Sequence, residues 1–283
     1  MIMNRRNFLS ASAASAACGL FASVARAAPG FTPQRFSVQV QGTGPDVILI
    51  PGLTASREIW RGTVTALPGY RYHLIQVAGF AGEPVRGNAR GEVVGPLAEE
   101  LARYIAARGL RRPAIVGHSM GGTIAMMIAA RHAGLVGKVM AVDMLPQPSG
   151  LFGADPNGVR GLADSLRDIA AAPGGRELVA SLMGMFGNPT DPRSRSDPDV
   201  VARATHDLAL IDLSDELPRI TAPLTIVYAS PDTQSRDAVD RTYAQAYRRA
   251  PTVKRIRIDN SGHMIMYDQP AKFRAAVASF LRS

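Results

Sequence analysis

The sequence has 283 residues, of which 46% are hydrophobic, with 27 glycines and 20 prolines. This composition is typical of a globular protein with one sizeable core, and it predicts a single α/β domain. The formal net charge is +9, but the basic residues are scattered. The basic runs interleaved with aromatics that mark nucleic-acid-binding proteins are absent, which argues against that class.

Residues 1–27 have the pattern of an export signal. Arg5 and Arg6 stand ahead of an aromatic residue and a leucine, a run of small apolar residues covers 10–24, and residues 25–27 form an A-x-A cleavage site. The apolar run is too short to span a bilayer. We therefore predict a twin-arginine signal peptide cleaved after Ala27, the twin-arginine export machinery as a partner, and a periplasmic or secreted location.

The only cysteine, Cys18, lies within this signal. Cleavage after Ala27 removes it, so the mature chain has no disulfide and its stability depends on its core. The alternative is a lipoprotein acylated at Cys18. In that alternative Ser15 stands where such sites usually carry an apolar residue.

Short β-branched runs alternate with longer amphipathic segments along the remaining chain. This alternation is typical of βα units that build a mostly parallel sheet. The predicted strands cover residues 36–40, 47–50, 73–77, 114–116, 138–142, 224–228 and 253–258. Residues 96–108 and 271–281 carry apolar side chains at helical spacing and are predicted to be outer helices.

The alternation stops after Asp143. Residues 145–217 contain no strong strand pattern but three helical stretches, near 159–171, 176–186 and 200–210. Long excursions in compact domains tend to be functional, as lids over a site are. We predict a core in two parts, residues 28–144 and 218–283, with a helical cap formed by residues 145–217.

The segment VGHSMGG, residues 116–122, lies between a predicted strand and a predicted helix. The spacing G-x-S-x-G in that context is typical of a nucleophile elbow, in which a strained turn presents the serine. Ser119 is the predicted nucleophile, and Gly117 and Gly121 keep the turn free of clashes. His118 is a poor base for its neighbour, because successive side chains at a sharp turn point apart.

The serine needs a general base, and His263 is the predicted one. His263 follows the last predicted strand, so it lies at the carboxyl edge of the sheet, where Ser119 also emerges. The remaining histidines, His73, His132 and His206, are predicted to be structural.

Two aspartates follow strands between the serine and the histidine, and either gives the chain order Ser, Asp, His. Asp143 ends one strand directly, whereas Asp232 lies on a loop long enough to curl back toward His263. We favour Asp232 as the acid that holds the base in its tautomer, with Asp143 as the alternative.

An oxyanion hole requires main-chain N–H donors. The residue after the nucleophile, Met120, is predicted to supply one. The second donor is expected in the loop Pro51-Gly52-Leu53-Thr54 after an early strand, and Leu53 is our choice.

Together these motifs resemble the α/β-hydrolase superfamily, in particular capped members that include many esterases. The resemblance runs through most of the mature chain, from Pro51-Gly52 through GHSMGG to ASPD and SGHMIMYDQP. It implies an α/β fold with a mostly parallel sheet flanked by helices and a small helical cap inserted after the sixth strand. In two places the sequence departs from many relatives. Pro51-Gly52 replaces their His-Gly, and residues 77–83 lack the aspartate and serine of their Asp-x-x-Gly-x-Gly-x-Ser segment.

The resemblance implies a serine hydrolase that cleaves carboxylic esters through an acyl-enzyme, with no metal and no cofactor, and the signal pattern implies that this hydrolase is exported. Its expected partner is a small-molecule ester or another acyl substrate. The alternatives on the same fold are an aminopeptidase, a lactonase and a cofactor-free perhydrolase. A non-catalytic binding protein that retains the scaffold is the alternative outside enzymes.

Overall fold

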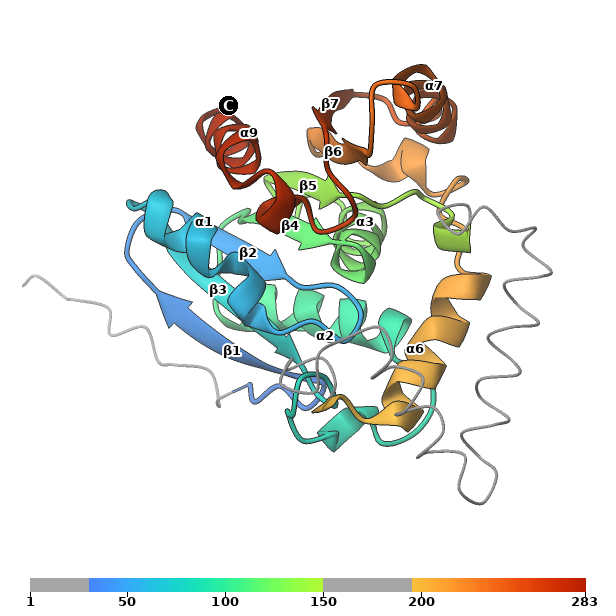
Figure 1. Cartoon of the computed structure of the whole chain (residues 1–283). Coiled ribbons are helices and arrows are strands. Elements are labelled where there is room, and N and C mark those ends of the chain that lie inside the picture. The colour runs from blue at the N-terminus through green and yellow to red at the C-terminus, as the bar shows by residue number, and fades with distance from the viewer. Residues whose placement is uncertain (1–30, 150–194) are drawn as a thin grey trace, which may run out of the picture. The chain divides into compact units, whose positions relative to one another are not determined.

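A single sheet organises the protein, as Figure 1 shows for the computed structural model, which describes residues 31–149 and 195–283. One compact unit spans Phe31–Ser283. In its described part the sheet has seven strands in the order β1-β3-β2-β4-β5-β6-β7. Strand β1 runs antiparallel to β3, and the other neighbouring pairs are parallel.

The strands are β1 (Phe36–Gln41), β2 (Asp46–Ile50), β3 (Arg71–Val77), β4 (Ala114–His118), β5 (Lys138–Val142), β6 (Leu224–Ser230) and β7 (Val253–Asp259). The α-helices are α1 (Arg61–Ala66), α2 (Val94–Ala107), α3 (Met120–Arg131), α6 (Pro198–Leu210), α7 (Arg236–Ala246), α8 (Ile265–Asp268) and α9 (Pro270–Arg282). Short 3-10 helices are η1 (Arg57–Trp60), η2 (Arg86–Asn88) and η5 (Leu217–Arg219).

Two apolar clusters cover the two faces of the sheet. One joins the sheet to α2, α3, α6 and α7, and the other joins it to η1, α8 and α9. In Figure 1, α2 and α3 accordingly lie on one face, and α1 and α9 on the other. Covering on both faces explains why β2 and β4 are nearly continuous apolar runs and not alternating ones.

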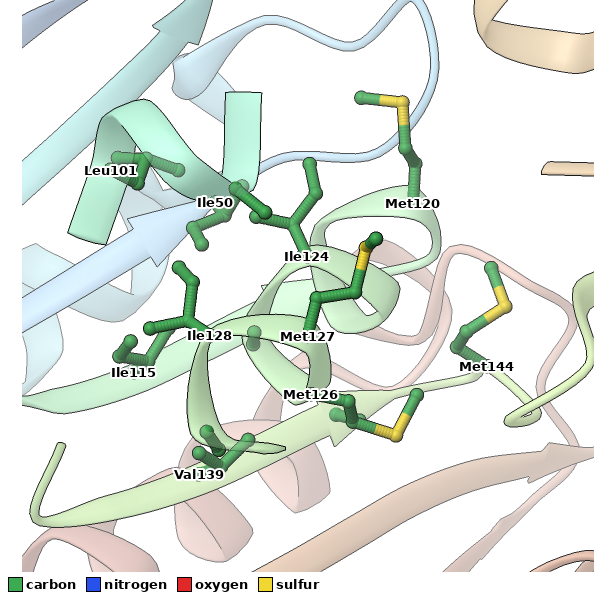
Figure 2. Close-up of a cluster of buried hydrophobic side chains, with 14 of the residues drawn as sticks. Ile50, Leu101, Ile115, Met120, Ile124, Met126, Met127, Ile128, Val139 and Met144 are labelled. Carbon is green, nitrogen blue, oxygen red and sulfur yellow. The ribbon is translucent and has the colours of Figure 1, made fainter. Parts of the chain in front are cut away.

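Helix α3 is buried almost along its whole length. Figure 2 shows Ile124 and Ile128 of this helix turned toward Ile50 and Ile115 of the sheet. Burial on nearly every side fixes the start of α3 against the ends of β2 and β4. The residue that precedes the helix, Ser119, is therefore held by a rigid part of the core.

The structure confirms the seven strands to within a few residues, and it confirms the outer helices as α2 and α9. The expected helix near 200–210 is α6. Helix α7 was not predicted, because its sequence is mostly polar and Tyr243 is its one buried residue. None of the helices in the described ranges combines the length and the apolar run that a bilayer crossing needs.

The predicted signal peptide and most of the predicted cap, residues 150–194, lie outside the described residues. The segment that carries the cap prediction follows β5, the fifth strand of the described sheet. That residues 145–217 form the helical cap stays a prediction.

Candidate active site

Ser119 occupies a strained turn between β4 and α3. Its backbone has φ 52° and ψ −123°, a region that residues other than glycine rarely adopt. The Ser119 N–H donates to the carbonyl of Val142 over 2.9 Å, and the N–H of Gly122 donates to the Ser119 carbonyl over 2.7 Å. These bonds hold the strained residue at the carboxyl end of β4, as a nucleophile elbow requires.

Glycine is required on both sides of this serine. A Cβ on Gly117 would lie 2.0 Å from the carbonyl oxygen of Gly121, and a Cβ on Gly121 would lie 2.3 Å from that of Ile50. Both distances are far below van der Waals contact. The expectation that these glycines keep the turn free of clashes is confirmed.

His118 points away from the serine and into the protein, as predicted. It is almost fully buried, and its Nε2 lies 2.9 Å from the carbonyl oxygen of His263. Burial, reinforced by the nearby His263, lowers the pKa of His118 to about 4. The ring is therefore neutral at pH 7, and its Nε2–H donates to that carbonyl.

His263 lies on the loop between β7 and α8, and its imidazole contacts Asp143. The two atoms, His263 Nδ1 and Asp143 Oδ2, are 2.8 Å apart. A carboxylate accepts, so Nδ1 carries the proton and Nε2 keeps the lone pair that a general base needs. The side chain of His263 is 47% exposed, whereas that of Asp143 is 11% exposed. His263 thus faces the outside, and Asp143 lies behind it in the protein.

The preference for Asp232 as this partner is wrong. The Asp232 carboxylate accepts the N–H of Ser235 over 2.7 Å and so closes the turn ahead of α7. That backbone hydrogen bond lowers the pKa of this fully exposed carboxyl. Asp143 follows β5 and His263 follows β7, the two strands that flank β6 in the sheet, and Val142 of β5 is paired to Val227 of β6. The Asp143 N–H continues this ladder by donating to the Val227 carbonyl over 2.7 Å.

The two predicted oxyanion donors lie on the loop after β2 and at the first residue of α3. A Cβ on Gly52 would lie 2.9 Å from His118 Nδ1 and 3.0 Å from Ser119 Cβ, so the loop that carries Leu53 abuts the serine. Outside the regular helix and strand ladders of the described residues, the N–H groups of Leu53 and Met120 donate to no backbone carbonyl. Their role as oxyanion donors stays a prediction.

Among the described residues, Ser119 Oγ makes no hydrogen bond. Hydrogen bonds between a catalytic serine and its base are often long before substrate binds. The segments that carry Ser119 and His263 are nevertheless close, because the rings of His118 and His263 are 4.6 Å apart.

Two other histidines, His73 and His132, bind side chains away from the site. His73 is buried, with Nδ1 2.7 Å from the Tyr104 hydroxyl and Nε2 2.9 Å from Asp46. His132 contacts Glu99. Both lie outside the cavity that His263 lines.

A cavity of about 350 Å³ opens beside the Asp143–His263 pair. Its walls are mostly apolar and are formed by Asp143, Leu145, Ala229, Pro231, Ala238, Val239, Thr242, Tyr243, Ser261, Gly262 and His263. A larger hollow of about 590 Å³ lies between η1, α1 and α9, and its lining includes none of the predicted site residues. Among residues 31–149 and 195–283, no group of three or more histidine, cysteine or acidic side chains is placed to hold a metal ion.

The sequence reasoning missed Tyr243, whose hydroxyl lies 3.0 Å from Asp143 Oδ1. The spacing of Tyr243 and Tyr247, one helical turn apart, was the available signal. The hundred-residue separation between Tyr243 and Asp143 hid the contact.

The sequence profile of the Alpha/beta hydrolase family matches residues 47–276. A pimeloyl-[acyl-carrier protein] methyl ester esterase of Vibrio vulnificus (strain YJ016) is 25% identical over 261 residues, which cover 86% of this chain and 96% of that protein. An N-formylmaleamate deformylase of Pseudomonas putida is 28% identical over 250 residues, or 85% of this chain and 90% of that protein. The solved structure of a thermophilic esterase from Thermogutta terrifontis matches with a TM-score of 0.70 at 22% identity, over 87% of this chain and 93% of that one.

Proposed function

This chain belongs to the alpha/beta hydrolase family and is a hydrolase enzyme, and from that premise we propose that it cleaves carboxylic esters with a Ser119–His263–Asp143 triad. One observation carries the proposal. His263 is held by Asp143 over 2.8 Å at the same sheet edge where Ser119 takes its strained conformation. A nucleophile elbow, a base and an orienting acid are the groups that acyl transfer requires, and their position at one sheet edge supports the proposal.

In the proposed reaction, Ser119 Oγ attacks the ester carbonyl while His263 Nε2 takes the hydroxyl proton. The N–H groups of Leu53 and Met120 stabilise the oxyanion, and Asp143 stabilises the imidazolium. The imidazolium then gives its proton to the leaving alcohol, which leaves an acyl group on Ser119. Water, deprotonated by His263, cleaves that acyl-enzyme and restores the serine.

Covalent labelling of the serine tests the proposal. A fluorophosphonate is expected to label the wild-type protein, to fail with Ser119→Ala, and to react very slowly with His263→Ala. The matched control is Ser279→Ala in α9, which removes a serine outside the cavity that His263 lines. A wild-type protein that folds but is not labelled would sink the proposal and favour a non-catalytic binding protein.

The substrate class that fits best is an ester with an uncharged group beside His263. Ser119 does not line the cavity there, so the cavity would hold a part of the substrate away from the attacked carbonyl. Leu145, Pro231 and Val239 give the cavity apolar walls, and apolar walls favour uncharged groups. The similarity to a pimeloyl-[acyl-carrier protein] methyl ester esterase supports ester cleavage as the reaction. A panel of p-nitrophenyl esters with increasing acyl length measures this preference, and equal kcat/KM across the panel would contradict selection by the cavity.

Amide cleavage is the second candidate, because one relative is named a deformylase. The same triad geometry serves either bond. Comparing kcat/KM for matched N-formyl amides and formate esters separates the two activities.

We also propose that residues 1–27 direct export, on the strength of Arg5, Arg6 and the A-x-A site alone. The double substitution Arg5→Lys and Arg6→Lys is expected to retain the uncleaved chain in the cytoplasm. N-terminal sequencing of the exported protein is expected to begin at Ala28. Export of the double variant at the wild-type level would contradict this route.

A further inference from the structure

The carboxylate of Asp143 is held by three donors. Oδ2 faces His263, while Oδ1 accepts the N–H of Ala229 and the hydroxyl of Tyr243, each over 3.0 Å. Asp143 itself has φ 50°, so its backbone is in the left-handed region that a non-glycine residue adopts only when its surroundings impose it. A residue in a strained conformation depends on such contacts for its orientation.

Tyr243 belongs to a stack of three tyrosines. Its ring lies 4.2 Å from that of Tyr228, nearly parallel at 14°, and 6.4 Å from that of Tyr247 at 9°. Tyr243 is buried, with 4% of its surface exposed. A ring packed between two others has little freedom to turn its hydroxyl away from Asp143.

The other two hydroxyls of the stack point elsewhere. Tyr228 donates to Asp240 over 2.7 Å, and Tyr247 donates to the carbonyl of Met144 over 2.7 Å. Within the described residues, Tyr243 is therefore the one member of the stack whose hydroxyl is bonded to Asp143. The three tyrosines can therefore be compared directly, because only the hydroxyl of Tyr243 contacts the Asp143 carboxylate.

We propose that Tyr243 is a positioning residue that fixes the Asp143 carboxylate so that Oδ2 stays directed at His263. The inference deepens the proposed triad and rests on it. Apart from His263, the carboxylate has two donors, and both bind Oδ1. Ala229 donates from near the end of β6, and the Tyr243 hydroxyl donates from α7, so together they hold Oδ1 in place and leave Oδ2 to His263.

The charges around the carboxylate support a role beyond packing. The titratable groups that face Asp143 are His263 from the loop after β7, Tyr243 from α7, Tyr247 just after α7, and the neutral His118 from β4. Burial and the neighbouring carboxylate raise the pKa of Tyr243 above its ordinary value, so the phenol remains a donor. Without the Tyr243 hydrogen bond, more of the negative charge of the Asp143 carboxylate acts on the ring of His263. That charge stabilises the imidazolium.

The test compares Tyr243→Phe with Tyr247→Phe and Tyr228→Phe, each of which deletes one hydroxyl from the same stack. Tyr243→Phe is expected to lower kcat on a p-nitrophenyl ester about tenfold, with KM within about twofold, since a hydrogen bond to a charged group is lost. The acid limb of its kcat/KM profile is expected to move to higher pH. The two controls are expected to keep the wild-type kcat and acid limb, with Tyr247→Phe differing in stability alone.

A double-mutant cycle shows whether Tyr243 acts through the acid. In an Asp143→Asn background, Tyr243→Phe is expected to change kcat by less than about twofold, because the carboxylate it orients is gone. A full tenfold further loss in that background would overturn the proposal. Wild-type kcat and an unmoved acid limb in folded Tyr243→Phe would overturn it as well.

Two checks separate this inference from its premise. If the wild-type protein is not labelled by a fluorophosphonate, the proposed triad fails and the tyrosine proposal falls with it. If the wild type is labelled and Tyr243→Phe behaves like Tyr247→Phe, only the tyrosine proposal fails. Should the phenylalanine variant not fold, Tyr243→Met and Tyr247→Met replace the pair with the same criteria.

Discussion

Each member of the proposed triad has a different local reason for its place. Ser119 is presented by backbone strain, His263 by a loop tied to His118, and Asp143 by a strand end next to β6. Asp232 carries the same functional group as Asp143, but its acceptor capacity is used by the turn ahead of α7. At the residue scale, the hydrogen-bond donors around each carboxylate determine whether it can orient the imidazole of His263.

Replacing each of the two aspartates by asparagine tests which one orients His263. Asp143→Asn is expected to lower ester turnover by roughly three to four orders of magnitude, because an amide cannot hold the imidazole in the required tautomer or stabilise its cation. Asp232→Asn is expected to stay within about threefold of wild type, since only a surface turn is affected. Steady-state kinetics on a p-nitrophenyl ester provide the measurement. A severe loss in Asp232→Asn with an active Asp143→Asn would restore the original preference.

His118 links pH to stability. Its folded pKa of about 4 lies below the ordinary value of 6.5, so between these two pH values the unfolded chain binds more protons than the folded one. The free energy of unfolding therefore falls as pH drops from about 6.5 to about 4, by up to roughly 3 kcal/mol from this residue. Buried His73, whose pKa is also lowered by burial, acts in the same direction.

Urea unfolding at pH 7 and pH 4.5 measures this effect in wild type and in His118→Gln, which keeps an N–H donor for the His263 carbonyl. The difference in unfolding free energy between the two pH values is expected to be smaller in the variant. An unchanged difference would mean that His118 is charged in the folded protein or exposed to solvent.

At the scale of elements, the site depends on where β4 stops and α3 starts. The turn between them has no room for an added methyl group, since a Cβ on Gly117 would lie 2.0 Å from a carbonyl oxygen. Gly62 in α1 is the contrasting case, with no atom within 4 Å of an added Cβ. The same chemical change therefore has opposite consequences in the two elements.

Gly117→Ala is expected to lower the free energy of unfolding by about 2 kcal/mol or more and to remove turnover, because the elbow must open to admit the methyl group. Gly62→Ala is expected to be neutral or to stabilise by up to about 1 kcal/mol, as alanine favours a helix. Urea unfolding and ester kinetics on both variants test the pair. Equal stability in the two variants would show that the elbow relaxes without cost.

At the scale of the whole molecule, one compact unit spans Phe31–Ser283, beyond the predicted signal. Both apolar clusters draw their described members from this unit. A chain shortened to residues 28–283 is expected to melt at the same temperature as the full chain and to keep its kcat. Differential scanning calorimetry measures the midpoint. A clearly lower midpoint in the shortened chain would show that residues 1–27 stabilise the folded unit.

The sequence by itself determined where the strands lie along the chain, the turn at Ser119 and the position of His263 on a loop. These features rest on local patterns, namely apolar periodicity and glycine placement within a few residues, which are independent of distant parts of the chain. The resemblance of the motifs then implied the fold that the family match and the sheet bear out.

Only the tertiary structure decided which aspartate meets His263 and which tyrosine meets that aspartate. Both contacts join residues far apart in the chain, His263 to Asp143 and Asp143 to Tyr243. They exist because β5 lies against β6 and because α7 packs its one buried face onto the sheet. Strand neighbours and helix facing are set by the packing of the whole core, which no short segment encodes.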